Sequence, residues 1–232
     1  MKITKLIALG AIGLSVISCN KDQIKTKTAL TTEIDSASYA LGLNMVQQFK
    51  AGFEDIDSDA FIQGYLNGKD STNLLISFKD IKPVLDGYFK RKQAKELEEK
   101  FGEYKKSNEA FLADNKGKEG VNTTSSGLQY TVLKEGNGSG ESPTKESKVK
   151  VHYHGTLIDG TVFDSSVDRG EPSEFGVGQV IKGWTEGLQL MKVGAKYKFF
   201  IPQELAYGGQ QRSATIKPYS TLIFEVELLE IK

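Results

Sequence analysis

In the first half of the chain, apolar residues recur at the three- and four-residue steps of an α-helix. The stripe starts near Asp35 and breaks at residues 55–58; its members are Tyr39, Leu43, Val46, Phe61, Tyr65 and Leu66. Such spacing places side chains on one helix face. Ser58 or Asp59 could cap the second helix, because a side-chain oxygen there can accept from a free backbone amide. We therefore predict two short helices within residues 35–66.

A longer helical pattern follows and predicts one helix over residues 77–113. Ser77 and Asp80 stand in a capping-box-like arrangement, and Pro83 falls within the first turn or so. Charges of both signs dominate residues 90–106, which is typical of a solvated face. An unbroken helix would be roughly 55 Å long, and one narrow apolar stripe on so long a helix cannot bury itself.

Alternation of apolar and polar residues replaces this pattern in the C-terminal half. It predicts strands at residues 126–133, 149–153, 197–201 and 222–228, and one short helix at residues 185–191. A single helix against a twisted antiparallel sheet is an α+β arrangement. The predicted fold is thus an α+β domain preceded by an all-α domain with a long connecting helix.

The first nineteen residues have the features of an export signal. Lys2 and Lys5 precede an apolar run over residues 6–17 that is too short to span a bilayer, and the chain's one cysteine, Cys19, follows. The cysteine resembles the lipobox of bacterial lipoproteins, in which the thiol is acylated and becomes the new N-terminus. An ordinary signal peptide with an incidental cysteine is the alternative. Residues 20–32 are polar and rich in lysine and threonine, which predicts a flexible tether over residues 19–34.

Composition excludes several kinds of site. Lysine plus arginine equals aspartate plus glutamate at 30 each, which argues against nucleic acid as a main partner. A single cysteine permits no intramolecular disulfide and no cysteine-based metal site. His152 and His154 are conceivable metal ligands on one strand face, but no third histidine exists, so we predict no metal and no cofactor.

Five short motifs in the C-terminal half occur in a characteristic order. They are V-H-Y-H-G followed by F-D-S-S at residues 151–166, Q-V-I-K-G-W at 179–184, L-A-Y-G at 205–208, Ile216, and T-L-I-F-E-V at 221–226. Together they resemble the FKBP family of peptidyl-prolyl cis-trans isomerases over residues 126–232. Taken singly, each of these residues could be an ordinary core or turn residue. Asp164, Ser165 and His152 could also suggest a hydrolase triad, but the sequence has no nucleophile elbow, which argues against one.

The resemblance implies a set of site residues. Those with implied catalytic roles are Tyr153, Asp164 and Tyr207; those lining the substrate cleft are Phe163, Val180, Ile181, Trp184, Ile216 and Phe224, with Arg169 expected to pair with Asp164 or a tyrosine hydroxyl. In the family, the proline ring lies against the residue that corresponds to Trp184. The backbone N–H of Ile181 resembles the family's donor of a hydrogen bond to bound ligand. Ser173 and Arg212 differ from the residues that human-type members of the family commonly have at these two positions. The two differences bear on which residues flanking the proline are preferred and on the affinity for macrolides.

The helical region resembles the macrophage infectivity potentiator subclass of FKBPs, and S-Y-A-L-G at residues 38–42 resembles its opening motif. That subclass carries a helical dimerisation domain and a long connecting helix, so the resemblance implies a homodimer; a monomeric helical extension is the alternative. The expected organisation is a signal peptide (1–18), a tether (19–34), a helical dimerisation domain with its connecting helix (35–115) and an isomerase domain (121–232).

The expected function is rotation of X–Pro bonds in unfolded or exported polypeptides, helping them to fold. The expected location is the cell envelope, with lipid on Cys19 as the anchor and the outer membrane favoured. A macrolide of the FK506 kind could act as an inhibitor. Two alternatives stay open from the sequence: a non-catalytic chaperone that binds unfolded clients through the same cleft and the helical arms, and a surface adhesin.

Overall fold

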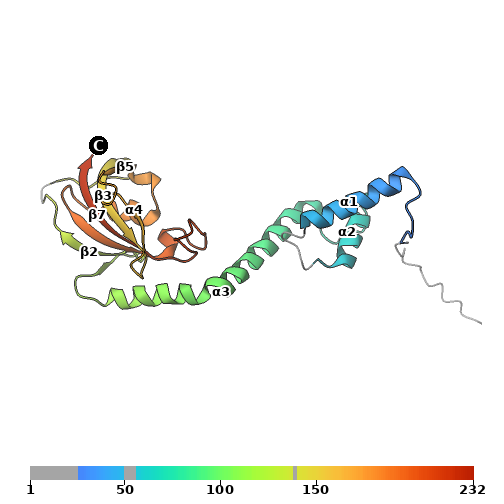
Figure 1. The fold of residues 1–232 in the computed structure, drawn as a ribbon, viewed down its shortest axis with the longest axis horizontal. Helices are drawn as coiled ribbons and strands as arrows, with labels where there is room; N and C mark the ends of the chain where they lie inside the picture. The colour runs from blue at the N-terminus through green and yellow to red at the C-terminus, as the bar shows by residue number, and fades with distance from the viewer. Residues whose placement is uncertain (1–25, 50–55, 138–139) are drawn as a thin grey trace, which may run out of the picture. The chain divides into compact units, whose positions relative to one another are not determined.

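The computed structural model describes residues 26–49, 56–137 and 140–232. The chain divides into two compact units, and the boundary between them falls between Ile76 and Ser77. The first unit holds helices α1 (Glu33–Phe49) and α2 (Ser58–Asp70), and the second holds helix α3 (Ile81–Lys116) and the sheet (Figure 1). The predicted signal peptide and Cys19 lie outside the described residues. The four predicted domain ranges stay predictions.

Helices α1 and α2 form where the apolar spacing predicts them. The cap of α2 is Asp57, whose Oδ1 accepts from the amides of Asp59 and Ala60 at 3.0 Å each. The prediction of Ser58 or Asp59 is therefore wrong by one or two positions, because the carbonyl of Asp57 already accepts the amide of Phe61 at 2.9 Å. No helix of the described residues is both long enough and apolar enough to cross a membrane.

Helix α3 is continuous over 36 residues, as its spacing predicts, and a short 3₁₀ turn (Phe78–Asp80) precedes it. The predicted capping box is not formed in the usual way, because the Ser77 hydroxyl donates to the Asp80 carboxylate at 2.5 Å and not to a backbone group. Exposed pairs such as Lys95 with Glu99 lie four residues apart along the helix. Such pairs contribute little to stability.

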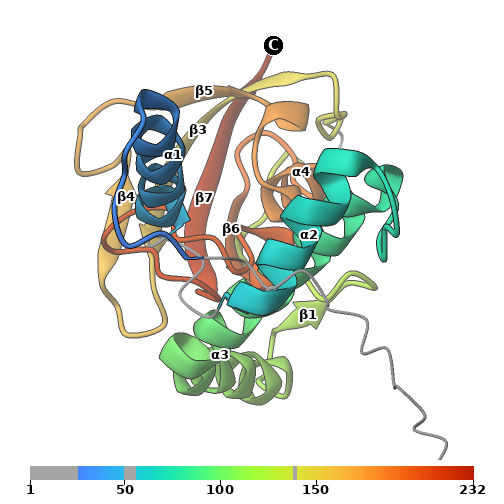
Figure 2. The same ribbon diagram turned by 90° about the vertical axis from the view of Figure 1, so that its right-hand side faces the viewer.

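Within the described residues, seven strands form one antiparallel sheet in the order β1-β2-β6-β7-β3-β4, and β5 pairs with β3. The strands are β1 (Asn122–Thr123), β2 (Gln129–Lys134), β3 (Lys148–Thr156), β4 (Val162–Ser165), β5 (Ser173–Gly176), β6 (Lys196–Ile201) and β7 (Leu222–Ile231). Figure 2 shows β3, β7 and β6 side by side in the sheet. The predicted α+β class is confirmed.

The short helix α4 (Lys182–Leu188) packs against the sheet, three residues earlier than the predicted range of 185–191. Two glycines allow this close approach. A Cβ on Gly183 would lie 2.4 Å from the Ile201 side chain, and one on Gly187 would lie 2.7 Å from Phe199. The apolar pattern that suggested a later helix includes Met191, which is fully buried although it follows the helix in a turn.

The core lies between α4 and the sheet, and strand alternation supplies it. Along β3 every second residue is buried, from Val149 through Val151 and Tyr153 to Gly155. The fully buried residues Phe199, Ile201, Leu222 and Val226 come from the neighbouring strands β6 and β7. One end of this core is aromatic, and four of the site residues predicted from the sequence, Tyr153, Phe163, Trp184 and Phe224, meet there.

Candidate functional site

Tyr153, Trp184 and Phe224 meet at the aromatic end of the core, from β3, α4 and β7. The ring centroids of Tyr153 and Trp184 are 5.4 Å apart, and those of Trp184 and Phe224 are 5.1 Å apart, each pair nearly perpendicular. Phe163 of β4 joins the set at 5.3 Å from Phe224, again edge to face. These distances and angles are favourable for aromatic pairs. We call Tyr153, Phe163, Phe175, Trp184 and Phe224 the aromatic cluster.

Gly155 makes room for two rings of this cluster. A Cβ at this position would lie 2.7 Å from Phe163 and 2.9 Å from Phe224, closer than side-chain atoms can approach. The absence of a side chain on β3 two residues beyond Tyr153 therefore lets both rings approach the strand closely. This is why the V-H-Y-H-G motif ends in glycine.

A polar network borders the cluster on one side. Tyr153 Oη donates to Asp164 Oδ2 at 2.6 Å, and Arg169 Nη2 donates to Tyr153 Oη at 2.9 Å. The Arg169 guanidinium also forms an ion pair with the Asp164 carboxylate, and its carbon lies 5.6 Å from the centre of the Tyr153 ring. The structure thus brings together three of the residues implied by the family resemblance, in one connected network.

Both acidic groups of this network have displaced pKa values. Burial raises the pKa of the Tyr153 hydroxyl, and its hydrogen bond to Asp164 raises it further. For Asp164, burial would raise the pKa, but the hydrogen bonds from Tyr153 and Arg169 outweigh it and hold the pKa below its usual value. At neutral pH the site therefore presents a protonated phenol and an ionised carboxylate.

Trp184 is almost fully buried, at 5% exposed. Its Nε1 is buried without a hydrogen-bond partner among the described residues. Phe175 lies 5.5 Å from the indole on a further side, at an angle of 81°. The indole is thus enclosed by rings on several sides, and it offers an apolar surface with no conventional hydrogen bond of its own.

The remaining implied residues surround the same core. Ile216 is buried in it, while Val180, Ile181 and Tyr207 are half-buried and pack against it. The carbonyl of Ile181 accepts the amides of Trp184 and Thr185 at 2.9 and 3.0 Å, which fixes this residue at the start of α4.

Tyr207 lies in the segment between β6 and β7, and the guanidinium carbon of Arg212 lies 5.6 Å from the centre of its ring. Among the described residues, no ring contact joins Tyr207 directly to the aromatic cluster; Tyr207 packs instead against the core that contains the cluster.

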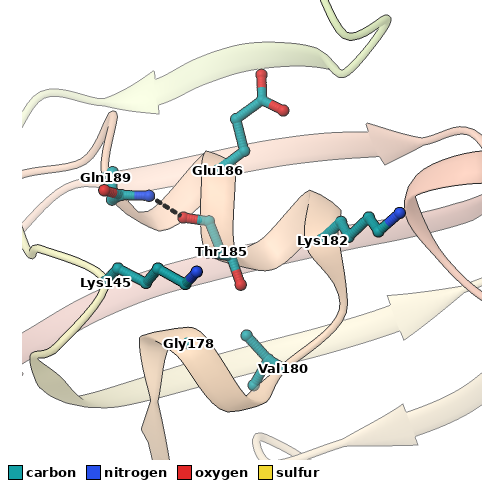
Figure 3. A pocket seen from close by; sticks show the side chains of 7 residues that line it. All are labelled: Lys145, Gly178, Val180, Lys182, Thr185, Glu186 and Gln189. Carbon is teal, nitrogen blue, oxygen red and sulfur yellow. Dashed lines mark hydrogen bonds between the residues drawn. The ribbon is translucent and has the colours of Figure 1, made fainter.

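A cavity of about 320 Å³ opens beside Val180, on the outer side of α4. Figure 3 shows that mostly polar side chains line it. Gln189 Nε2 donates to the Thr185 carbonyl there at 2.7 Å. The other lining residues are Lys145, Gly178, Lys182 and Glu186. Its polar lining distinguishes it from the aromatic cluster.

The two histidines face serines and not the Asp164 carboxylate. His152 Nδ1 lies 3.2 Å from Ser166 Oγ, and His154 Nδ1 lies 3.0 Å from Ser165 Oγ. Asp168 Oδ2 lies 3.8 Å from His154 Nδ1, so the same ring nitrogen faces both the Asp168 carboxylate and the Ser165 hydroxyl. A hydrolase relay needs two different ring nitrogens for these contacts. Among the described residues, no group of three potential ligands could hold a metal ion.

Comparison with known proteins assigns the two regions of the chain. Residues 139–229 match the family described as FKBP-type peptidyl-prolyl cis-trans isomerase, and residues 34–132 match the domain described as amino terminal to it. The outer membrane protein MIP of Legionella longbeachae is 39% identical over 98% of this chain and 97% of its own length. The chain belongs to the FKBP-type peptidyl-prolyl cis-trans isomerases. It is therefore an isomerase of X–Pro bonds, as its motifs indicate.

Two further FKBP relatives support this assignment. The FKBP-type 22 kDa peptidyl-prolyl cis-trans isomerase of Escherichia coli is 44% identical over 84% of this chain and 94% of its own length. The crystal structure of FkpA from Escherichia coli has a TM-score of 0.56 and 34% identity, and covers 88% of this chain and 99% of that one. The predicted family and fold are thus confirmed together.

Sequence reasoning missed Phe175 of this FKBP domain. Its ring lies 6.0 Å from Tyr153 and 5.5 Å from Trp184, so it belongs to the aromatic cluster as closely as Phe163 does. The residue stands on β5, a strand of four residues with no clear alternation. The available signal was an aromatic residue in the short segment after Arg169, but only its pairing with Val149 on β3 places it in the cluster.

Proposed function

We propose that the aromatic cluster binds the proline ring of a polypeptide substrate, with Trp184 as the floor and Tyr153, Phe163 and Phe224 as walls. One observation carries this proposal: an enclosed indole without a hydrogen bond, ringed by aromatic side chains, has a single connected polar network at its border. A proline side chain is a compact apolar ring, which such a surface suits. No nucleophile or cofactor is required, because the reaction breaks no bond.

The chemistry depends on the character of the twisted amide. Rotation about a peptide bond faces a barrier of about 18–20 kcal/mol, since conjugation between nitrogen and carbonyl is lost at the top. The twisted state is less polar than the planar amide, so a site that excludes water favours it relative to bulk solvent. A thousandfold acceleration needs only about 4 kcal/mol of such differential stabilisation.

The polar residues hold the substrate on either side of the rotating bond. In this proposal the Ile181 N–H and the Tyr207 hydroxyl bind carbonyl groups of the flanking chain, while Trp184 fixes the ring. Asp164 is ionised and acts by orienting the Tyr153 hydroxyl and by its charge, not by moving a proton. Ile216 and Val180 complete the apolar walls.

A protease-coupled assay on a prolyl tetrapeptide tests the proposal. Substitution of Asp164 or Tyr153 should reduce the isomerisation rate while circular dichroism shows a folded chain. Unchanged rates in both variants would mean that the site lies elsewhere. An FK506-like macrolide should compete with the peptide if the cluster is the binding site, and inhibition without competition would speak against it.

For the N-terminal unit we propose a homodimer in which a second copy covers α1 and α2. Neither helix has a buried residue, and large apolar side chains stand exposed: Tyr39 is 58%, Leu43 is 52% and Tyr65 is 66% accessible. Contiguous apolar surface on a soluble protein usually marks an interaction site. A twofold pairing of identical surfaces is the commonest way to cover it.

Sedimentation velocity tests the dimer. Leu43→Glu combined with Val46→Glu should yield monomers, while Gln47→Glu on the same helix should leave the dimer intact. These monomers should retain activity on small peptides, because the site lies in the other unit. A sedimentation coefficient that does not change in the double variant would overturn the proposed interface.

We further propose that lipid on Cys19 anchors the enzyme in the cell envelope, where it assists the folding of exported proteins. The lipobox-like sequence supports this, and a relative of nearly equal length bears the name outer membrane protein. Multiple acyl chains hold a protein firmly, at about 0.8 kcal/mol per buried methylene. Mass spectrometry of the N-terminal peptide should show acylation at Cys19, and Cys19→Ala should release the enzyme from membranes; an unmodified cysteine would refute the anchor.

A further inference from the structure

The segment between β6 and β7 carries two of the proposed substrate-binding residues. In this segment, residues 202–221, Tyr207 stands in the first half and Ile216 in the second half, and both pack against the core that contains the aromatic cluster. Residues 210–214 of the segment are exposed, so its tip receives no support from the core. Its geometry therefore depends on what holds its two ends.

Helix α3 contacts the second end of this segment through a buried asparagine. Asn108 is 2% exposed, and its Oδ1 accepts the amide of Thr221 at 2.8 Å. Its Nδ2 donates to the Tyr104 carbonyl one helical turn earlier at 2.8 Å, which fixes the orientation of the side chain. Thr221 directly precedes β7, which carries Phe224. A side-chain amide held at both ends is a rigid attachment.

Further contacts from α3 reach the residues beside Thr221. Tyr104 Oη lies 3.1 Å from Ser220 Oγ, and the Lys105 ammonium lies 5.3 Å from the centre of the Tyr219 ring. Tyr219 has φ of 66°, a left-handed conformation that costs free energy in a residue with a side chain. Such a conformation persists only where the surroundings determine it.

The same helix also reaches the first end of the segment. A Cβ on Gly209 would lie 3.2 Å from Leu97 Cδ1 and 3.5 Å from Tyr219, so these groups are close neighbours. The amide of Tyr219 donates to the Gly208 carbonyl at 2.8 Å, which ties the two ends together. Helix α3 thus clamps the base of the segment that presents Tyr207 and Ile216.

We propose that Asn108 is a positioning residue for catalysis, which holds the 207–221 segment in the geometry that the substrate site needs. This inference rests on the proposed roles of Tyr207 and Ile216. It gives the C-terminal half of α3 a function besides connecting the two units. Small displacements of groups that position a substrate can lower catalysis strongly.

Asn115 offers a matched control on the same helix. It is also 2% exposed, and its Nδ2 donates to Gln129 Oε1 at 2.9 Å, on strand β2. Asn108→Ala and Asn115→Ala therefore each remove one buried amide of α3, but only the first releases the 207–221 segment. A loss of stability alone should affect both variants alike.

The test compares kcat/KM on a prolyl tetrapeptide at a temperature where all variants are folded. Asn108→Ala should lose at least about fivefold, and Asn115→Ala should stay within about twofold of the parent enzyme. Hydrogen exchange should quicken at Thr221 and through residues 207–220 in the first variant only. Equal losses in both variants, or none in Asn108→Ala, would overturn the inference.

A double variant separates positioning from an independent effect. If Asn108 acts through the segment that carries Tyr207, then Asn108→Ala should cost less in the Tyr207→Phe background than in the parent enzyme, whereas fully additive losses would contradict the inference. Should Asn108→Ala fail to fold, Tyr104→Phe, which removes the bond to Ser220, should show a smaller loss of the same kind, and full activity there would count against the proposal. An inactive parent enzyme would refute the proposed function instead.

Discussion

The Tyr153 hydroxyl on β3 donates a 2.6 Å hydrogen bond to the Asp164 carboxylate on the neighbouring strand β4. This bond joins the apolar cleft to its polar border. The phenol ring belongs to the aromatic cluster, while the hydroxyl also receives a hydrogen bond from Arg169 at 2.9 Å. One side chain therefore contributes both a wall and a positioned dipole. Its two contributions can be separated by substitution.

Tyr153→Phe should keep the wall and remove the dipole. We expect kcat/KM on a prolyl peptide to fall at least about tenfold, because a hydrogen bond to a charged group contributes about 1.5–3 kcal/mol. Tyr197→Phe is the control, since the Tyr197 hydroxyl bonds to the Leu190 carbonyl outside the cluster. An equal loss in the control, or full activity in Tyr153→Phe, would contradict the role given to this hydroxyl.

The isomerase rate should be independent of pH from about 5 to about 9, because Asp164 stays ionised and Tyr153 stays protonated across that range. The pKa of Asp164 is lowered in the folded state, so its contribution to stability is present above its unfolded pKa and is lost as pH falls through the folded value. The pKa of Tyr153 is raised, so its contribution is lost only as pH rises above about 10. A pH–rate profile with a step near neutrality would show that another group titrates in the mechanism.

Trp184→Ala should damage both the fold and the site. Removing a large buried aromatic side chain costs about 3–5 kcal/mol of unfolding free energy, which urea denaturation can measure. Trp184→Phe should be milder in both respects, since it keeps an apolar ring and removes an Nε1–H that lacks a partner. If the alanine variant is destabilised but turns over peptide at the parent rate, then Trp184 is a residue of the hydrophobic core and does not form the floor of the substrate site.

Gly155→Ala should disturb the walls of the cleft without touching a polar group. The added methyl would meet Phe163 and Phe224 at under 3 Å, so at least one ring must move. Forced overpacking typically costs about 1–3 kcal/mol, and we expect the rate on peptide to fall with it. Gly42→Ala serves as comparison, because nothing lies within 4 Å of a Cβ there; it should leave the rate unchanged. A parent-like rate in Gly155→Ala would place substrate away from these rings.

Much of the fold could be predicted from the periodicity of apolar residues, but the positions of the short elements could not. The steps of α3 and the alternation of β3 are long enough to determine their type, so both were predicted within a few residues. Helix α4 was placed three residues late, because its position follows from Gly183 and Gly187 fitting against β6 and not from its own apolar pattern. Short strands such as β5 become strands through pairing with β3, which no local pattern reveals.

The same distinction applies to the site. Tyr153, Asp164, Phe163 and Trp184 came from motifs carried by family resemblance, and the structure brings them together in one cluster and its network. Phe175 and Asn108 were missed, because each acts through a partner distant in sequence: Trp184 for the first, Thr221 for the second. A buried asparagine in a charged helix gives no signal until its partner is known.

The central claim is that the proline ring of the substrate lies against Trp184, and the fluorescence of this residue tests it directly. Trp184 is the single tryptophan of the chain, so its emission reports on the cleft alone. Titration with a prolyl peptide should change the emission saturably, with a midpoint near the KM for isomerisation, and the same peptide with alanine in place of proline should not. Full turnover without any change in emission, or an equal change with the alanine peptide, would contradict the account.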